Sequence, residues 1–214
     1  MKKEIELKKL DTEVVSDALD YLGINGCCLG FSPRSNKQKI CGRVFTVKFT
    51  KVKKGEPGPA ADYIDEVPEG SVIFIDNDSI GDCTVWGSIL TRMAKLRKIN
   101  GTIINGACRD ADFNKQSDYP IFSKHVYMRT GKNRVKLSSV NEKLEIGGVT
   151  VKPGDYALCD GSGVVIIPQE SVADVIKKAK EIESNEGRII KAINNGTALK
   201  EARKKNSYNI KPKK

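Results

Sequence analysis

The sequence predicts a mixed α/β domain, and three patterns support this prediction. Residues 72–76 and 101–105 are short apolar runs that indicate buried strands, and residues 84–96 between them have the apolar spacing of a helix. A strand, a helix and a strand in this order form a βαβ unit, so the two strands are expected to be parallel neighbours. The chain of 214 residues, 39% of them hydrophobic, is long enough to bury a sizeable core.

The N-terminal part of the chain predicts one helix and one strand before this unit. Residues 10–22 repeat apolar side chains on one helical face, whereas residues 23–36 are typical of turn and loop. Alternation over residues 40–49 predicts a strand. A basic loop rich in Gly and Pro, residues 51–59, then leads into a short helix predicted around residues 60–67.

The C-terminal part predicts further strands and one long helix. The strands are expected over residues 121–128, 135–140, 144–151, 156–160 and 164–168. The helix is expected from Ser171 to about Asn194, where Gly196 can end it. Because no internal repeat or domain boundary is evident, residues 1–196 are assigned to a single domain and residues 197–214 to a basic C-terminal tail.

Composition and cysteine spacing indicate a cytoplasmic protein with reduced thiols. No apolar run approaches the roughly 20 residues that span a bilayer, and residues 1–10 lack the apolar centre of a signal peptide. The six cysteines include no Cys-x-x-Cys pair, which disfavours a zinc site. We therefore expect buried, reduced cysteines and no membrane association.

Positive charge is concentrated at the C-terminal end. The formal net charge is +10, of which residues 200–214 carry +6 from seven Lys or Arg and one Glu. Such a tail can bind nucleic acid or acidic partners, but Tyr208 is its only aromatic residue, which gives little support for stacking on bases. A solvated, partly disordered tail is the favoured interpretation, and nucleic-acid binding is left open.

Residues 101–112 hold the strongest chemical signal. Their strand is predicted to end in a flexible Asn-Gly-Ala turn, which Arg109, Asp110 and Asp112 follow directly. Ligands of α/β folds bind where strands end. Arg offers a planar fork for a carboxylate or phosphate, and Asp offers a hard oxygen ligand for a divalent metal. The alternative interpretation is a surface ion pair between Arg109 and Asp110, which contributes little.

A second candidate segment begins the helix that follows the first central strand. It consists of Gly87, Ser88, Ile89 and Leu90. Backbone N–H groups at a helix N-terminus attract anions. Because the two central strands are expected to be neighbours, this segment and residues 109–112 are predicted to meet in one pocket that binds a small anion.

Six short motifs occur in an order that is specific as a set. They are Asp17-Ala18-Leu19, the strand from Gly42 with Thr46, Trp86-Gly87, Asn105-Gly106-Ala107-Cys108-Arg109-Asp110, Val151-Lys152-Pro153-Gly154-Asp155, and Asp-Gly-Ser-Gly-Val-Val-Ile-Ile-Pro at residues 160–168. With these motifs the chain resembles the RraA-like family over roughly residues 10–195. That family groups the ribonuclease-activity regulator A proteins with the class II 4-hydroxy-4-methyl-2-oxoglutarate/4-carboxy-4-hydroxy-2-oxoadipate aldolases. Many members carry an older label as demethylmenaquinone methyltransferases.

The resemblance implies an α/β fold of the swivelling β/β/α type, assembled into trimers or hexamers with active sites at subunit interfaces. It places the family's pyruvate-binding loop on residues 87–90, its substrate-binding arginine on Arg109 and its metal-binding aspartate on Asp110. Asp112 fills the family's acidic position shortly after the metal ligand. Asn105 departs from the Asp that many members carry, which is expected to alter support for the metal.

These residues suggest a divalent-metal-dependent lyase, of the class II aldolase or oxaloacetate decarboxylase type, that cleaves a small 2-oxo acid and releases pyruvate. Asp110 would hold Mg²⁺ or Mn²⁺, Arg109 would neutralise charge on the keto oxygen, and Asp112 would assist a metal-ordered water as base. The alternative is a non-catalytic RraA-type regulator that binds a ribonuclease or another protein partner. Retention of Asp110 favours the enzyme. A methyltransferase is disfavoured, because no Gly-x-Gly-x-Gly loop follows an early strand.

Overall fold

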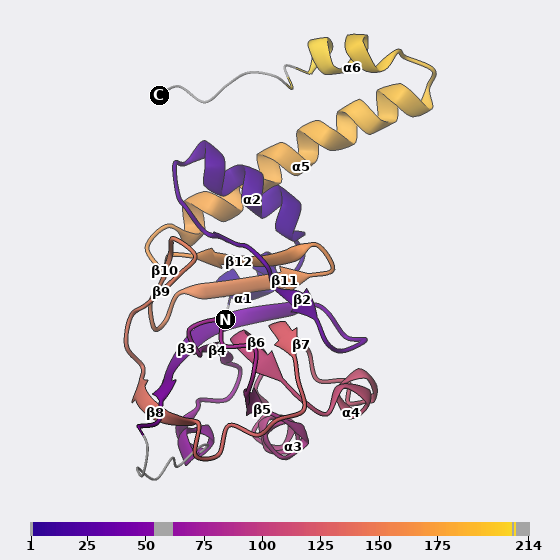
Figure 1. Cartoon of the computed structure of the whole chain (residues 1–214). Helices are drawn as coiled ribbons and strands as arrows, with labels where there is room; N and C mark the ends of the chain where they lie inside the picture. The colour runs from indigo at the N-terminus through magenta and orange to yellow at the C-terminus, as the bar shows by residue number, and fades with distance from the viewer. Residues whose placement is uncertain (1, 54–61, 207, 209–214) are drawn as a thin grey trace.

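The computed structural model describes residues 2–53, 62–206 and 208, and it shows a mixed α/β fold built in layers (Figure 1). The helices are α1 (Lys2–Leu7), α2 (Thr12–Tyr21), the 3₁₀ helix η1 (Asp62–Glu66), α3 (Ser88–Leu96), α4 (Ala111–Gln116), α5 (Val172–Asn194) and α6 (Leu199–Lys205). The strands are β1 (Cys27–Cys28), β2 (Ser32–Pro33), β3 (Ile40–Lys51), β4 (Val72–Asp76), β5 (Thr84–Trp86), β6 (Gly101–Cys108), β7 (Ile121–Val126), β8 (Val135–Val140), β9 (Leu144–Ile146), β10 (Val149–Val151), β11 (Tyr156–Asp160) and β12 (Gly163–Ile167).

Strand β3 connects two halves of one large sheet. The ten strands follow the order β1-β12-β11-β3-β4-β6-β7-β2, with β5 beside β6 and β8 beside β3. Residues 40–43 of β3 pair antiparallel with β11, whereas residues 44–48 pair in parallel with β4. In Figure 1 helices α2 and α5 lie over β11 and β12, and helices α3 and α4 lie at the opposite side of the molecule.

Alternation along the strands divides the apolar side chains among three core layers. Successive side chains of a strand point to opposite faces. Phe74 of β4 and Ile166 of β12 therefore belong to a core between the two halves of the sheet. Leu158 points the other way, into the core beneath α2 and α5. Ile75 points into a third core, which α3 covers.

The predicted βαβ unit is confirmed, and with it the α/β fold class. Strands β4 and β6 pair in parallel from Val72 opposite Gly101 to Asp76 opposite Asn105, and α3 lies between them in the chain. Strands β3, β4, β6 and β7 are all parallel neighbours. Their carboxyl ends therefore meet at one edge of the sheet, where α/β folds bind ligands.

Element boundaries at this edge differ from the prediction in two places. Residues 84–86, predicted as helix, form strand β5, and α3 begins only at Ser88. Strand β6 continues through Cys108, so the predicted turn at residues 105–107 is wrong. The physical reason is that β5 pairs in parallel with Ala107 and Cys108, which gives partners to backbone groups that a buried turn would leave unpaired.

Several short elements lie in segments where none was predicted. They are α1, α4, and the strands β1 and β2 within residues 23–36. Residues 144–151, predicted as one strand, form an antiparallel hairpin of β9 and β10. Gly147 and Gly148 allow the turn because they adopt φ values of +59° and +83°, which favour glycine.

The predicted basic tail contains a packed helix. Ala202 of α6 is fully buried and the other six residues of the helix are exposed, so the tail is solvated over α6 as expected but is ordered there, while residues 207 and 209–214 lie outside the described residues. The short helix predicted around residues 60–67 is the 3₁₀ helix η1, and residues 54–61 also lie outside the described part. Within the described residues, no helix has the length and apolar character needed to cross a membrane.

Candidate active site

The pairing of β5 with β6 places two segments side by side that are distant in the sequence. Trp86 aligns with Cys108, and the backbone N–H of Arg109 donates a 3.0 Å hydrogen bond to the carbonyl oxygen of Trp86. Gly87 then serves as the N-cap of α3, and Asp110 serves as the N-cap of α4. The starts of two helices therefore meet at the carboxyl edge of the sheet.

The Asp110 carboxylate is held by the first residue of α3. Its Oδ2 accepts a 2.7 Å hydrogen bond from the backbone N–H of Ser88 and lies 3.9 Å from Nε of Arg109. Partial burial raises the pKa of Asp110, but the N–H and hydroxyl of Ser88 and the Arg109 guanidinium outweigh this effect and hold the pKa below its ordinary value. Asp110 is therefore ionised at neutral pH, and 34% of its side-chain surface is exposed.

The backbone around these charges is tightly packed. Asp110 has a φ of +60°, in the left-handed region that few residues other than glycine adopt. A Cβ on Gly87 would lie 2.8 Å from Oδ2 of Asp110 and 3.1 Å from Nε of Arg109. Glycine at position 87 therefore allows both charged side chains to lie against the start of α3.

A buried network supports the site from below. Nε1 of Trp86 donates a 2.9 Å hydrogen bond to Oγ1 of Thr91, and the indole ring stacks on Tyr119 with ring centroids 6.2 Å apart. Nδ2 of Asn114 donates a 2.8 Å hydrogen bond to the carbonyl oxygen of Arg109. Because these four supporting side chains are buried, α3, α4 and the end of β6 are held together as one unit.

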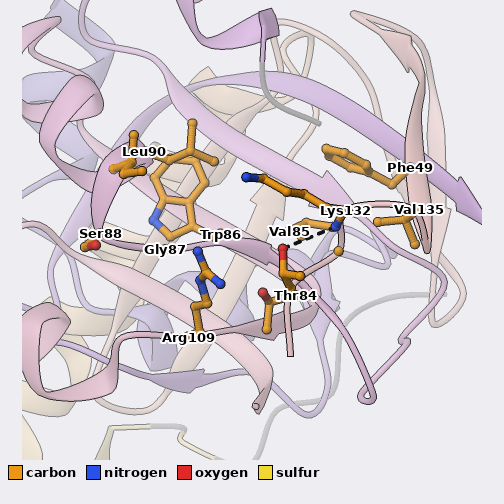
Figure 2. Close-up of a pocket in the computed structure, with 13 residues that line it drawn as sticks. Phe49, Thr84, Val85, Trp86, Gly87, Ser88, Leu90, Arg109, Lys132 and Val135 are labelled. Carbon is orange, nitrogen blue, oxygen red and sulfur yellow. Dashed lines mark hydrogen bonds between the residues drawn. The ribbon is translucent and has the colours of Figure 1, made fainter. Parts of the chain in front are cut away.

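An open pocket of about 140 Å³ lies beside the start of α3 (Figure 2). The predicted residues Gly87, Ser88, Ile89, Leu90 and Arg109 line it, although the Ile89 residue is 77% exposed. The lining is completed by Phe49, Thr84, Val85, Trp86, Thr130, Gly131, Lys132 and Val135. The structure therefore brings the start of α3 and Arg109 into one pocket, whereas residues 110–112 of the predicted second segment do not line it.

Lys132 is a pocket residue that the sequence analysis missed. Figure 2 shows the side chains of Lys132 and Arg109 both directed toward the middle of the pocket. Gly131 passes so close to Thr84 that a Cβ would lie 2.4 Å from the carbonyl oxygen of Thr84. The Thr-Gly-Lys segment between two predicted strands was the available signal, but only the bridge between Thr84 and Thr130 brings it to the site.

Three residues from the sequence analysis do not line this pocket, namely Asp110, which lies beside it against Ser88 and Arg109, Asp112 and Asn105. Asp112 is exposed in the first turn of α4, and no hydrogen bond or ion pair within the described part of the chain joins it to Asp110. Asn105 belongs to another network, in which its Nδ2 donates to Oδ1 of Asp76 and its Oδ1 accepts from Oγ of Ser79, each at 2.7 Å.

The carboxylate at this site suits a hydrated hard cation. The described residues contain no group of three or more His, Cys, Asp or Glu that could hold a metal ion. A zinc site takes three or four protein ligands and does not fit. Mg²⁺ keeps several waters and binds through one or two carboxylates, so the partly exposed Asp110 fits such an ion. Asp110 is therefore the residue that would hold a divalent metal.

The start of α3 also offers hydrogen-bond donors. The first N–H groups of a helix have no partner within the helix. Asp110 accepts from the N–H of Ser88, and Ile89 and Leu90, the next residues of this first turn, line the pocket. Together with Arg109, these groups can bind a small carboxylate.

These features define an α/β protein with an Arg–Asp pair and a helix start beside a pocket at the carboxyl edge of its sheet. Residues 12–166 match the family described as RraA-like, Aldolase/RraA. The chain therefore belongs to the RraA-like family.

Relatives of known sequence agree with this assignment. Protein DlpA of Legionella pneumophila is 41% identical over 95% of this chain, and the chain spans 33% of the length of DlpA. A protein of Halalkalibacterium halodurans named "Putative 4-hydroxy-4-methyl-2-oxoglutarate aldolase" is 30% identical over 85% of this chain and 83% of its own length.

Solved structures show the same fold. The crystal structure of an uncharacterized protein from Pseudomonas syringae pv. tomato matches with a TM-score of 0.87 at 42% identity, over 94% of this chain and 96% of that chain. RraAS2 of Streptomyces coelicolor, described as an unusual member of the RNase ES inhibitor RraA protein family, matches with a TM-score of 0.79. Its 21% identity, over 87% of this chain and 95% of that chain, supports the fold alone.

Proposed function

We propose that the chain is a lyase that cleaves a carbon–carbon bond in a small 2-oxo acid and releases pyruvate, with Mg²⁺ or Mn²⁺ held by Asp110. The observation that carries this proposal is the contact of Asp110 with Ser88 and Arg109 beside a pocket lined by a helix start. The aldolase name of the Halalkalibacterium relative supports the reaction class.

Arg109 and the start of α3 would stabilise the charge that develops during cleavage. Breaking the bond between the carbons α and β to the keto group leaves an enolate with negative charge on the keto oxygen, and the Arg109 guanidinium would neutralise this charge. The N–H groups of Ile89 and Leu90 would orient the substrate carboxylate. Lys132 adds a second cation to the same pocket.

Asp110 would act as the ligand of the divalent ion. When bound, that ion supplies Lewis-acid polarisation of the substrate. The lowered pKa of Asp110 keeps its carboxylate ionised at neutral pH. The hydrogen bond from Ser88 to Oδ2 fixes the orientation of the carboxylate. Asp112, exposed in the first turn of α4, would assist a water as base.

Decarboxylation of oxaloacetate is proposed as a second activity of the same residues. Loss of CO₂ from oxaloacetate also leaves negative charge on a keto oxygen, so the same cation at Arg109 would stabilise it. We also propose a cytoplasmic trimer or hexamer, as membership of the RraA-like family suggests.

The first test is pyruvate release from oxaloacetate and from 4-hydroxy-4-methyl-2-oxoglutarate, with Mg²⁺ and then with EDTA. We expect metal-dependent release from at least one of them, abolished by Asp110→Ala. Arg109→Lys should lower the rate about a hundredfold, since an ammonium group cannot reproduce the planar fork. Asp174→Ala, exposed in the first turn of α5, is a control that should keep full activity.

Two outcomes would contradict this proposal. Full activity of Asp110→Ala would show that Asp110 does not hold the metal. If neither acid yields pyruvate, the non-catalytic regulator, which binds a ribonuclease or another protein partner, becomes the better hypothesis.

A further inference from the structure

A cleft of about 320 Å³ on the opposite edge of the sheet is lined by lysines. Its floor includes Ile99 and Asn100, which precede β6, and Pro120, which precedes β7. The cleft therefore lies at the amino ends of the parallel strands, whereas Arg109 and Asp110 lie at their carboxyl ends. We call it the lysine cleft, and its lysines are Lys8, Lys37, Lys39, Lys95 and Lys98.

The lysines reach this cleft from three separate parts of the chain. Lys8 follows α1, Lys37 and Lys39 precede β3, and Lys95 and Lys98 lie at the end of α3. Lys and Arg account for 37 of the 214 residues, whereas Lys alone accounts for five of the eleven residues that line the cleft. The fold thus concentrates positive charge here well above the average of the chain.

Two of the five lysines form ion pairs with carboxylates. Asp118 is the one carboxylate in the described lining. Lys39 forms ion pairs with Asp11 at 2.9 Å and with Asp160 at 3.8 Å. The pair of Lys98 with Glu69, at 3.2 Å, has both side chains at least 66% exposed and is therefore weak.

The other three lysines have no carboxylate partner in the described structure. Nζ of Lys95 donates a 2.6 Å hydrogen bond to the carbonyl oxygen of Ser117, which carries no charge. No ion pair within the described residues joins Lys8 or Lys37 to a carboxylate. Like charges that face one cleft repel each other, and a bound polyanion would remove this repulsion.

We propose that the lysine cleft binds a small anion that carries two or more phosphate groups. Lysines are point charges that bind phosphate without the planar geometry that favours Arg for carboxylates. Because the ammonium groups come from three segments, a ligand whose charge is spread over several groups matches them better than a single carboxylate does. The cleft is also large enough for such a ligand.

The lining favours a small molecule over single-stranded RNA. Proteins that bind single strands combine a charged groove with aromatic side chains on which bases stack. Tyr119 is the aromatic residue in the described lining, and it is 2% exposed. Its ring already stacks on Trp86 and its hydroxyl lies 2.8 Å from Oγ1 of Thr102, so it offers no face to a base.

Calorimetric titration of the full chain with inorganic tripolyphosphate tests this proposal. We expect saturable binding at one site, weaker at high ionic strength, and much weaker binding of inorganic phosphate. The double variant Lys8→Ala/Lys37→Ala should bind tripolyphosphate at least about tenfold more weakly, because two charged contacts are lost. Both side chains are exposed, so the fold should persist, and circular dichroism checks this.

A charge-matched control separates the cleft from the general positive charge of the chain. Lys143→Ala/Lys200→Ala removes the same charge from exposed positions outside the cleft and should leave affinity within about twofold. Equal losses in both double variants, or no saturable binding, would overturn the proposal. Displacement of tripolyphosphate by a single-stranded RNA that binds more tightly through Lys8 and Lys37 would overturn the small-molecule assignment.

Discussion

At the residue scale, Asp110 and Gly87 determine the geometry of the candidate site. Asp110 combines a left-handed backbone with a carboxylate that Ser88 and Arg109 stabilise. Gly87 is the matching position, because a Cβ there would lie 2.8 Å from Oδ2 of Asp110. The two charged side chains can reach the start of α3 only because residue 87 has no side chain.

We expect Gly87→Ala to displace Asp110 and Arg109 and to lower pyruvate release about tenfold or more, since small displacements of reacting groups are costly. The matched control is Gly187→Ala within α5, where a Cβ meets no other atom within 4 Å. This control should keep activity and raise the free energy of unfolding by roughly 0.5–1 kcal/mol. Steady-state kinetics and thermal melts measure both, and a wild-type rate for Gly87→Ala would refute this account of the glycine.

The charge of Asp110 should stabilise the fold only above acidic pH. Its folded-state pKa lies below the ordinary value of about 3.9, so its contribution is complete above that value and is lost as the pH falls through the folded-state pKa. Asp110→Asn keeps the shape and tolerates the left-handed backbone. The difference in unfolding free energy between wild type and Asp110→Asn, measured in urea, should therefore shrink below about pH 4. A difference that stays constant through the acid range would show that the charge is not stabilised.

Among the elements, the short strand β5 connects the parts of the site. It pairs with the end of β6, bridges to Thr130, and leads directly into α3. Trp86, its last residue, anchors α3 through Thr91 and stacks on the buried Tyr119, which lies between α4 and β7. The three residues of β5 therefore position both the start of α3 and the segment that carries Lys132.

We expect Thr91→Val to destabilise the protein by about 1–3 kcal/mol, because it leaves the buried indole N–H of Trp86 without a partner in an apolar setting. Thr91→Ser keeps the hydroxyl and should cost less. Urea unfolding measures both variants. A valine variant as stable as the wild type would mean that this hydrogen bond does not hold α3 against β5.

In the whole molecule, the parallel strands of the sheet have a carboxyl edge and an amino edge, and each edge carries a different candidate ligand site. The candidate active site lies at the carboxyl edge, and the lysine cleft lies at the amino edge. Helix α5 packs on α2 near its start, and its far end carries α6 away from the sheet in Figure 1. The C-terminal helices are therefore separate from the pocket at Arg109.

We expect a chain that ends at Gly196 to keep its pyruvate release and to lose about 1–2 kcal/mol of stability, since the packing of α6 on α5 is lost. Ala202→Asp, at the buried position of α6, should reproduce the loss, whereas the exposed Lys200→Ala should not. Thermal melts and the pyruvate assay measure this. A large loss of activity in the shortened chain would place α6 or the residues after it in the catalytic function.

Elements with a strong periodic pattern could be predicted from the sequence. The bounds of β4, β8 and β11 agree with the prediction, because each strand carries enough alternating or apolar residues to show its period. Strand β5 could not be predicted, since three residues are too few for a period and its partner lies more than 20 residues away in the chain. Secondary-structure propensity also cannot show that β6 continues through Gly106, because this extension depends on the pairing of β6 with β5.

The amino-acid sequence by itself determined the α/β class and the parallel βαβ unit, because periodicity is a local property, and the order of its motifs, through the family resemblance, singled out Arg109 and Asp110 as candidates. Only the tertiary structure decided which groups share a site. It brought Lys132 to the pocket, left Asp112 exposed and gathered five lysines into one cleft. The reason is that distances between remote segments are set by strand pairing and core packing, which no short stretch of the chain contains.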